Sequence, residues 1–366
     1  MTLHIFNPEH DIALAANLSN FTAPHAGRQL RNDLGFLPAL WAADGDQILV
    51  EHEESAVKSY RRVCHRLAQL GIKNTFGENK FTTGVNKITT GEINNTTGGI
   101  NIQPWGWDKA IRRELERKGF SVSELPTESQ IDCIRQLSHR RTSARLLPLL
   151  RMEGTVGEAF ECTTVDAVAD LLQRYGRLVL KAPWSSSGRG VRFLTMDNGQ
   201  LTVDNWMRHV IAAQGSIMAE PYYDKVKDFG MEFMAEADGT VRYLGLSLFH
   251  TVNGAYVGNI LATETVKQQM ISRYIPVELI DKTKQSIRDH LRLDGYVGPF
   301  GIDMMIVNNC QSFKVQCLLH PCVEINLRRT MGHVALAISH ADDDIRGVMR
   351  VIYDGNHYKL KINKLQ

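Results

Sequence analysis

A short apolar segment that carries a lysine into a Ser/Gly-rich turn is the feature that most constrains how this chain folds. Residues 178–181, Leu-Val-Leu-Lys, predict a buried strand, and residues 191–194, Val-Arg-Phe-Leu, predict its partner across the turn. The turn itself, residues 182–190, reads Ala-Pro-Trp-Ser-Ser-Ser-Gly-Arg-Gly. Two interpretations follow: a loop that binds phosphate, or a glycine-rich hairpin that exposes its lysine.

The phosphate interpretation rests on the atoms that this turn presents. Small residues let backbone N–H groups approach phosphate oxygens, glycines permit positive φ, and serine hydroxyls add donors. The lysine supplies a compact positive charge, and the arginine supplies a second one. The segment is neither a Walker A loop, G-x-x-x-x-G-K-[ST], nor the dinucleotide motif G-x-G-x-x-G. The candidate phosphate-binding residues are Lys181, Ser185, Ser186, Ser187, Gly188, Arg189 and Gly190.

Two segments nearer the C-terminus predict a metal site. Asp303 lies in an apolar strand pattern, whereas Glu324 and Asn326 stand two residues apart in another and therefore face one side of it. A carboxylate among apolar neighbours is costly to bury unless it is paired or binds a cation. Carboxylate and amide oxygens suit Mg²⁺ that is held jointly with nucleotide phosphates. The alternative is that the carboxylates form ion pairs with arginines such as Arg328 or Arg329.

Two further carboxylates lie between the turn and the acidic segments. Glu220 ends an apolar strand pattern that begins at Ile217, and Glu232 lies within the segment Gly-Met-Glu-Phe-Met. A nucleotide needs hydrogen-bonding groups for its adenine and a carboxylate for its ribose hydroxyls. Glu220 with its neighbouring backbone and Glu232 are candidates for these roles, and surface salt bridges are the alternative for both.

The wider pattern predicts an open α/β domain up to about residue 130, followed by a β-rich region. Strands are expected at 3–6, 48–50, 217–220, 232–236, 241–249, 302–307 and 314–319. Helices are expected at 53–70, 109–118, 131–150 and 278–291. Residues 71–99 are rich in Thr, Asn and Gly, which predicts irregular structure, weakly formed hairpins or a disordered loop.

Composition limits the classes of protein that fit. The 366 residues are 43% apolar and 22% charged, as in a globular protein with two or three subdomains. The net charge of +2 and the scattered basic residues argue against nucleic-acid binding. No apolar run reaches membrane-spanning length and the first residues lack a signal-peptide pattern, so we expect a cytoplasmic location. The six cysteines form no C-x-x-C pair, which argues against a zinc site or a disulfide framework, and base rates favour a homodimer.

The order of these features resembles the ATP-grasp superfamily over residues 131–335, about half of the chain. The most specific part of the resemblance is the closing Glu324-Ile325-Asn326. It implies an N-terminal α/β domain at 1–130, an ATP-grasp lid subdomain at 131–215 and a C-terminal lobe with the metal site at 216–366. ATP would lie between two lobes and contact the lysine, the Ser/Gly loop, the linker with Glu220 and Tyr222, and Glu232. Asp303, Glu324 and Asn326 would hold Mg²⁺.

Two departures from the superfamily pattern stand out. Many relatives carry a second lysine ahead of the lid, where this chain has Ser-His-Arg-Arg-Thr-Ser. Arg140 or Arg141 would take over its contact with the α-phosphate, and we expect Arg141 to do so, although arginine and lysine are not interchangeable. The stretch from Asp303 to Glu324 is also longer than usual, with His320-Pro321 inserted near its end.

The resemblance implies an ATP-dependent ligase. Such an enzyme activates a small-molecule carboxylate as an acyl phosphate and joins it to an amine or thiol, with release of ADP and phosphate. Lys181 would stabilise the transferring phosphoryl group and Arg328 would bind the substrate carboxylate, unless Arg328 forms a solvent-facing basic pair with Arg329. A small-molecule kinase and a non-catalytic ATP-binding regulator are the alternatives.

Two polar segments of the N-terminal domain are candidates for the acceptor site. Asn7-Pro8-Glu9-His10-Asp11 follows the first strand, where open α/β sheets bind ligands, although a turn that caps the next helix is the favoured explanation. Trp105-Gly106-Trp107-Asp108 is a weaker candidate, with domain packing as the alternative.

Overall fold

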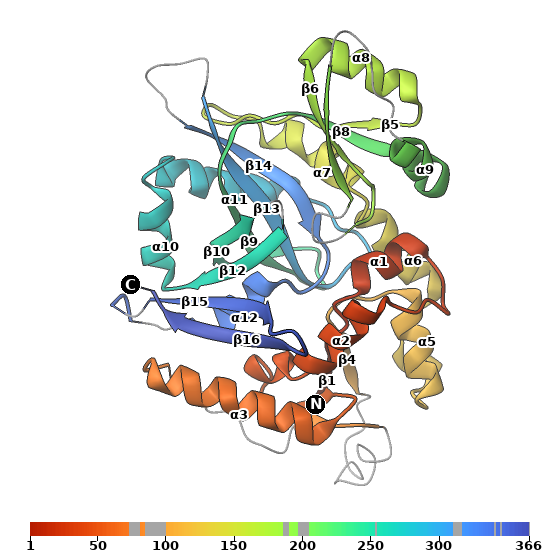
Figure 1. The fold of residues 1–366 in the computed structure, drawn as a ribbon, viewed down its shortest axis with the longest axis vertical. Coiled ribbons are helices and arrows are strands. Elements are labelled where there is room, and N and C mark those ends of the chain that lie inside the picture. Colours follow the sequence, from red (N-terminus) through yellow and green to blue (C-terminus); the bar gives the residue numbers. More distant parts are fainter. Residues whose placement is uncertain are drawn as a thin grey trace. The chain divides into compact units, whose positions relative to one another are not determined.

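We describe a computed structural model of the chain, which separates into two units (Figure 1). The first unit comprises Met1–Arg135, Val257–Val266 and Arg328–Gln366, and the second comprises Gln136–Tyr256 and Lys267–Leu327. The C-terminal residues from Arg328 onward therefore group with the N-terminal unit, not with the lobe expected at 216–366. The structure describes residues 1–72, 81–84, 100–185, 190–196, 205–252, 255–309, 317–339, 342–344 and 346–365.

A four-stranded parallel sheet organises the first unit. Its order is β3 (Phe81–Thr82), β2 (Gln47–Leu49), β1 (Thr2–Ile5) and β4 (Asn101–Pro104). The chain adds strands on one side of β1 and then crosses to the other side, so the direction of winding reverses between β1 and β4. The helices of this part are α1 (His10–Ala16), α2 (His25–Leu34), η1 (Leu37–Leu40), α3 (Glu53–Gln69), α5 (Lys109–Arg117), η3 (Val122–Glu124) and α6 (Glu128–Leu137).

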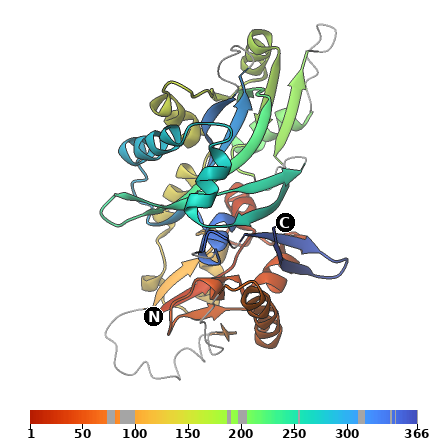
Figure 2. The same cartoon turned by 90° about the vertical axis from the view of Figure 1, so that its left-hand side faces the viewer.

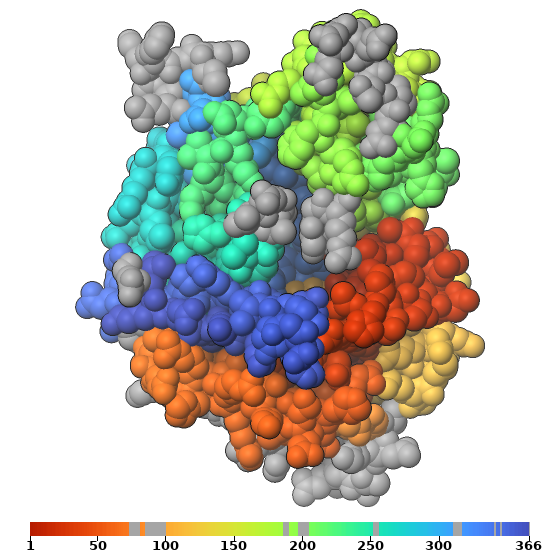
Figure 3. Space-filling view, in the orientation of Figure 1, coloured from red at the N-terminus to blue at the C-terminus, as the bar shows by residue number. Residues whose placement is uncertain are grey.

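The two chain ends share the core of this unit. Strand β12 (Ala255–Leu261) pairs through Asn259–Leu261 with β15 (Gly347–Tyr353), which forms a hairpin with β16 (Tyr358–Lys364). That hairpin is the blue ribbon beside the label C in Figure 2. Apolar side chains of the N-terminal residues, α12 (Met331–Ala337) and the hairpin form one buried cluster. The red N-terminal and dark-blue C-terminal residues accordingly lie side by side on the surface in Figure 3.

The second unit contains two antiparallel sheets. The first has the order β5 (Phe160–Cys162), β8 (Ile217–Pro221), β6 (Arg177–Lys181) and β7 (Val191–Thr195). Helices α8 (Val165–Tyr175) and α9 (Asn205–Gln214) pack their apolar faces on it and form a separate small core. The predicted pairing of 178–181 with 191–194 is confirmed, since Leu178 lies opposite Leu194 and Lys181 opposite Val191.

The second sheet of this unit has the order β10 (Val241–Ser247), β9 (Lys225–Ala235), β13 (Gly298–Asn308) and β14 (Cys317–Asn326). Phe233 and Phe300 stack across β9 and β13 with their ring centroids 5.2 Å apart. The strand predicted at 241–249 is divided, because β10 ends at Ser247 and β11 (Phe249–Val252) begins after Leu248. Other elements of this region are α7 (Arg141–Leu146), η4 (Leu147–Leu150), α10 (Glu264–Ile271) and α11 (Val277–His290).

The predicted fold class, a mixed α/β protein with an N-terminal open α/β part, is confirmed by these elements. The predicted helices at 53–70, 109–118 and 278–291 correspond to α3, α5 and α11. Nearly all of the 71–99 segment and the residues Ser186, Ser187, Gly188 and Arg189 lie outside the described part of the chain. None of the helices in the described part has the length and apolar character that crossing a bilayer requires.

Candidate nucleotide-binding site

The lysine of the Ser/Gly turn is buried, not exposed. Lys181 ends β6 beside β8, and its Nζ donates a hydrogen bond of 2.6 Å to Oε2 of Glu220. Only 9% of the lysine side chain and 7% of the glutamate side chain are exposed. The two predicted nucleotide residues therefore form one buried ion pair, so neither the exposed-lysine hairpin nor the surface salt bridge describes them.

The turn is closed at its base by a backbone hydrogen bond. The N–H of Ala182 donates to the carbonyl of Gly190 over 2.8 Å. A Cβ atom on Gly190 would lie 2.3 Å from Oγ of Ser185, so the close approach of the two arms requires glycine at this position. Ser185 and Gly190 thus flank the mouth of the turn.

Arg140 connects this turn to the acidic segments. Its Nη1 donates to Oγ of Ser185 over 2.8 Å and to the carbonyl of Ala182, while its Nη2 lies 2.8 Å from Oε1 of Glu324. The residue is buried and directly precedes α7. One guanidinium group therefore contacts both the predicted phosphate loop and a predicted metal ligand.

The three predicted metal ligands lie on adjacent strands. Asp303 of β13 is directly opposite Glu324 of β14, and Nδ2 of Asn326 donates to Oδ2 of Asp303 over 3.1 Å. Side chains directly opposite in an antiparallel pair have Cβ atoms about 4.5–5.5 Å apart. The N–H of Ile325 donates to Oγ of Ser143 in α7 over 3.0 Å, which fixes β14 at this point.

This donor set fits a hard divalent cation. Two carboxylates and an amide lie within one cross-strand cluster, in which the amide nitrogen of Asn326 faces Asp303. Carboxylate and amide oxygens are the ligands that Mg²⁺ prefers when phosphates complete its coordination. No group of three or more His, Cys, Asp and Glu side chains arranged for a metal occurs among the residues that the structure describes. The arginine pairing foreseen for Glu324 does exist, but its partner is Arg140, not Arg328 or Arg329.

Glu232 is placed one strand away from this cluster. It lies in β9 opposite Gly301 of β13, two residues from Gly230, which is opposite Asp303. The residue is 3% exposed, so it is not part of a surface salt bridge. Burial raises the pKa of Tyr256, and the charge of Glu232 raises it further, which places these two groups within electrostatic range.

Cys322 of β14 lies within electrostatic range of charged groups from both sheets of this unit. Burial raises the pKa of the Cys322 thiol to about 12, and its other influences include a hydrogen bond with Ser143 and the charges of Glu220, Asp303 and Lys181. Since charges act over short distances inside a protein, these groups surround one point of the strand. Lys181, Glu220 and Asp303 therefore all lie within electrostatic range of Cys322.

His320 is a feature of this region that the sequence reading did not recognise. It is fully buried, its two ring nitrogens have no hydrogen-bond partner in the described structure, and burial together with the charge of Lys181 lowers its pKa to about 3. His320 and Pro321, the residues inserted near the end of the Asp303–Glu324 stretch, lie within β14. A register shift between Asp303 and Met305 accommodates them, and proline is tolerated because β14 is an edge strand.

Three predicted site residues have other partners. Arg141 pairs with Glu161 at 2.7 Å, so the arginine brought to the Ser185 turn is Arg140. Tyr222 directly follows β8, but its ring packs against the guanidinium of Arg177, which lies 3.8 Å from the ring centroid.

Arg328 lies in the first unit, where its Nε and Nη2 donate to the carboxylate of Asp11. Its Nη1 donates to the carbonyl of Arg329. The role predicted for Arg328 as a ligand of the substrate carboxylate is therefore not supported by its contacts, and neither is the solvent-facing pair with Arg329.

The two polar segments of the N-terminal unit contact each other. Nδ2 of Asn7 donates to the carbonyl of Gly106 over 2.8 Å, and His10 lies 3.3 Å from the carboxylate of Asp108. Asp108 accepts from the N–H groups of Ala110 and Ile111, so it is the N-cap of α5. The Asn7–Asp11 segment does not cap α1 through a side chain. These loops follow β1 and β4, the two strands between which the winding reverses.

Comparisons with known proteins give likeness in fold only. No family model and no curated protein matches the sequence. The N5-carboxyaminoimidazole synthetase from Staphylococcus aureus complexed with ADP matches at 13% identity and a TM-score of 0.38, over 70% of this chain and 66% of that chain. The biotin carboxylase–β-γ-ATP complex from Campylobacter jejuni matches at 13% identity and a TM-score of 0.43, over 68% and 58%. D-alanyl-alanine synthetase A from Vibrio cholerae matches at 16% identity and a TM-score of 0.36, over 67% and 72%.

The chain thus spans less than two thirds of the length of the first two proteins. Because all three TM-scores are below 0.5, we base the functional proposal on the side chains of this chain alone.

Proposed function

We propose that this protein is an ATP-dependent ligase that activates a small-molecule carboxylate as an acyl phosphate and transfers the acyl group to an amine. The observation that supports it is the position of Arg140, whose guanidinium joins the Ser185 turn to Glu324. Cations beside a Ser/Gly turn suit phosphate oxygens, and carboxylates beside them suit the metal that accompanies phosphates. Such an arrangement has the charge distribution that a Mg²⁺–nucleotide complex requires.

Each residue has a distinct task in this proposal. Lys181 and Arg140 bind phosphate oxygens and stabilise negative charge that develops during phosphoryl transfer. Glu220 orients Lys181 through their ion pair. Asp303, Glu324 and Asn326 would hold Mg²⁺, which would supply positive charge that neutralises the phosphates.

No side chain of the protein is needed as a nucleophile. The substrate carboxylate attacks the γ-phosphorus, ADP leaves, and the amine then displaces phosphate from the acyl phosphate. Arg140 is paired with Glu324, so nucleotide phosphates would compete with the Glu324 carboxylate for the Arg140 guanidinium. Arg140 replaces Arg141 in this scheme, and Arg328 is not part of it.

Nucleotide binding is tested by thermal unfolding with and without Mg²⁺ and ADP. A ligand at about a hundred times its dissociation constant stabilises a protein by roughly 2.7 kcal/mol. We expect a Mg²⁺-dependent rise in the unfolding midpoint for the wild type and a smaller rise for Lys181→Ala, Arg140→Ala and Glu324→Gln. Lys284→Ala is the control, because Lys284 pairs with Asp281 on the surface of α11 in the same unit. No rise at millimolar nucleotide would overturn the proposal.

The acyl transfer is tested separately with ATP, candidate carboxylates and hydroxylamine. An acyl phosphate reacts with hydroxylamine to give a hydroxamate, whereas the phosphoryl ester formed by a kinase does not. Hydroxamate that requires both ATP and the carboxylate supports the ligase. A stable phosphorylated alcohol would assign the kinase alternative, and ATP binding without turnover would assign the regulator.

A further inference from the structure

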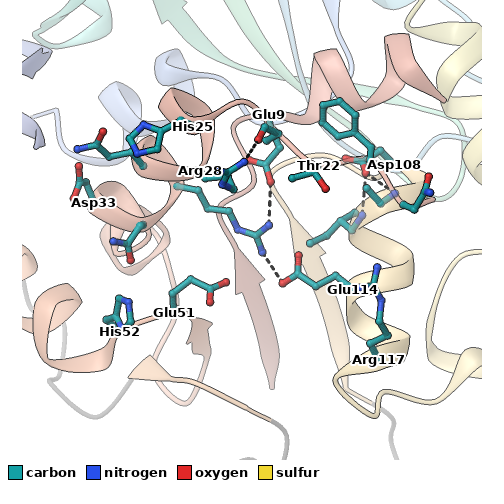
Figure 4. Close-up of a pocket in the computed structure, with 18 of the residues that line it drawn as sticks. Glu9, Thr22, His25, Arg28, Asp33, Glu51, His52, Asp108, Glu114 and Arg117 are labelled. Atoms are coloured by element: carbon teal, nitrogen blue, oxygen red, sulfur yellow. Dashed lines mark hydrogen bonds and ion pairs between the residues drawn. The ribbon is translucent and has the colours of Figure 1, made fainter. Parts of the chain in front are cut away.

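The N-terminal unit contains a cavity that the proposed nucleotide site does not use. Its volume is about 760 Å³, within the usual range for small-molecule pockets. Glu9 after β1, Glu51 after β2 and Asp108 after β4 all line it, and α2 and α5 form its walls (Figure 4). It therefore opens at the carboxyl edge of the parallel sheet, beside the point where the winding reverses, which is where open α/β sheets bind ligands.

An arginine at the back of the cavity is surrounded by acids. Nη1 of Arg31 lies 2.9 Å from Oε1 of Glu9, and its Nη2 lies 2.8 Å from Oε1 of Glu114. Burial lowers the pKa of Arg31, but the charges of Glu114, Glu9 and Glu51 outweigh burial and the pKa is raised. Figure 4 shows these three glutamates facing the same space. One buried positive charge thus faces three carboxylates, which leaves an excess of negative charge.

Glu9 has an unused acceptor in this space. Its Oε1 is paired with Arg31, but its Oε2 is buried and has no hydrogen-bond partner within the described structure. Burial is the main reason that the pKa of Glu9 is raised. An acceptor that is buried without a donor is unfavourable, so a ligand that donates a hydrogen bond to Oε2 would stabilise this arrangement.

Two other acids of the cavity are already engaged. Asp108 caps α5 and also contacts His10 and Asn7. Asp33 accepts from His357 and from the N–H of Tyr358. The carboxylates that can meet a ligand are therefore those grouped around Arg31.

The rim of the cavity has the opposite charge. Arg28 and Arg117 line it and are exposed, as is His25. Figure 4 shows His25 and Arg117 toward opposite sides of the view and Arg28 close to Glu9. A ligand with a cationic group inside and an anionic group at the rim would match both regions.

We propose that this cavity binds a small zwitterion that carries a primary ammonium and a carboxylate, the chemistry of a free amino acid. The ammonium donates to Oε2 of Glu9 and is attracted by Glu51, and the carboxylate lies beside Arg28. Binding of the zwitterion in this cavity does not depend on the proposed function.

The probe is an equimolar mixture of the twenty free amino acids, observed by saturation-transfer NMR at neutral pH without nucleotide. Acetate, propionate and hexanoate, which lack the amine, are measured in parallel. The amino acid with the strongest signal is then titrated by calorimetry into the wild type, Glu9→Gln, Glu51→Gln and Glu128→Gln. Glu128→Gln is the matched control, because Glu128 is an exposed acid of the same unit outside the cavity lining.

We expect one or a few amino acids to bind and the simple carboxylates to give no signal. Loss of a charge-assisted hydrogen bond should weaken binding roughly 10- to 100-fold in Glu9→Gln. Glu51→Gln should weaken it less, and Glu128→Gln should leave it unchanged. Since Glu51 is exposed, its variant keeps the test decisive if Glu9→Gln does not fold.

Three results would overturn the inference: no amino acid binds, the simple carboxylates bind equally well, or both cavity variants bind as tightly as the control. Mg²⁺–ADP binding to the same preparation separates this failure from that of the proposed function. Nucleotide binding without amino-acid binding removes the cavity assignment alone. Amino-acid binding without nucleotide binding retains the cavity and removes the ligase.

Discussion

Replacement of Glu220 by glutamine is expected to destabilise the second unit, because it leaves the ammonium of Lys181 buried without its charged partner. The two groups are 2.6 Å apart and both side chains are less than 10% exposed. Glutamine has nearly the same shape as glutamate, so the substitution removes charge with little change in packing.

The size of the effect follows from the burial of the pair. At 2.6 Å and an effective dielectric constant of about 20, two unit charges attract by about 6 kcal/mol, which is an upper bound on the loss. Removal of one partner from a buried pair typically costs about 3–5 kcal/mol, because the remaining charge is uncompensated. At about 2–4 °C per kcal/mol, the unfolding midpoint should fall by at least about 6 °C.

The assay is urea and thermal unfolding of the wild type, Glu220→Gln, Lys181→Met and the double variant. The double variant should lose less unfolding free energy than the two single variants lose together, because it leaves no unpaired charge. Asp281→Asn is the control, because it removes the surface pair with Lys284 and should change stability by less than about 0.5 kcal/mol. The burial of this pair would be refuted if the two single variants lost unfolding free energy additively in the double variant. It would also be refuted if Glu220→Gln changed the unfolding free energy no more than Asp281→Asn does.

Two further predictions concern His320 and Gly106. The pKa of His320 is lowered to about 3, so between about pH 6.5 and 3 the unfolded chain binds a proton that the folded chain does not. The contribution of the neutral His320 to stability is thus complete above pH 6.5 and is lost as the pH falls, by up to about 1.4 kcal/mol per pH unit. The unfolding free energy, measured in urea from pH 7 to 4, should therefore decline less steeply for His320→Leu than for the wild type. Equal slopes for the two proteins would contradict this prediction. A Cβ atom on Gly106 would lie 2.6 Å from the ring of His10, so Gly106→Ala should lower the unfolding free energy by about 1–3 kcal/mol. The Cβ atom of Gly84→Ala would meet no atom of the described residues within 4 Å, so this variant should be nearly neutral, and similar unfolding midpoints for the two variants would exclude the clash.

Local patterns predicted the strands and helices that carry the site. The apolar run before Lys181 identified β6, and the alternation around Glu324 and Asn326 correctly placed both side chains on one face of β14. Such features depend on residues near in sequence, because side-chain alternation and turn chemistry are local properties of the backbone. The order of the candidate residues along the chain was likewise sufficient to indicate the superfamily resemblance.

The choice between neighbouring residues was beyond the sequence. Arg140 and Arg141 are adjacent and chemically identical, yet one contacts Ser185 and Glu324 whereas the other pairs with Glu161. The difference arises because successive residues at the start of a helix point in directions about 100° apart, and only the docking of α7 against β14 decides which direction faces the site.

The sequence by itself therefore determined many of the helices and strands, including the strand that ends at Lys181 and the strand that carries Glu324 and Asn326, since each depends on short-range patterns of apolar and polar residues. Only the tertiary structure decided the partners of its charged groups. Arg328 is paired with Asp11 across 317 positions of the chain, and Arg31 with Glu114 across 83. Contacts of this kind depend on how distant elements pack, and the burial that makes each charge seek a partner exists only once the fold has formed.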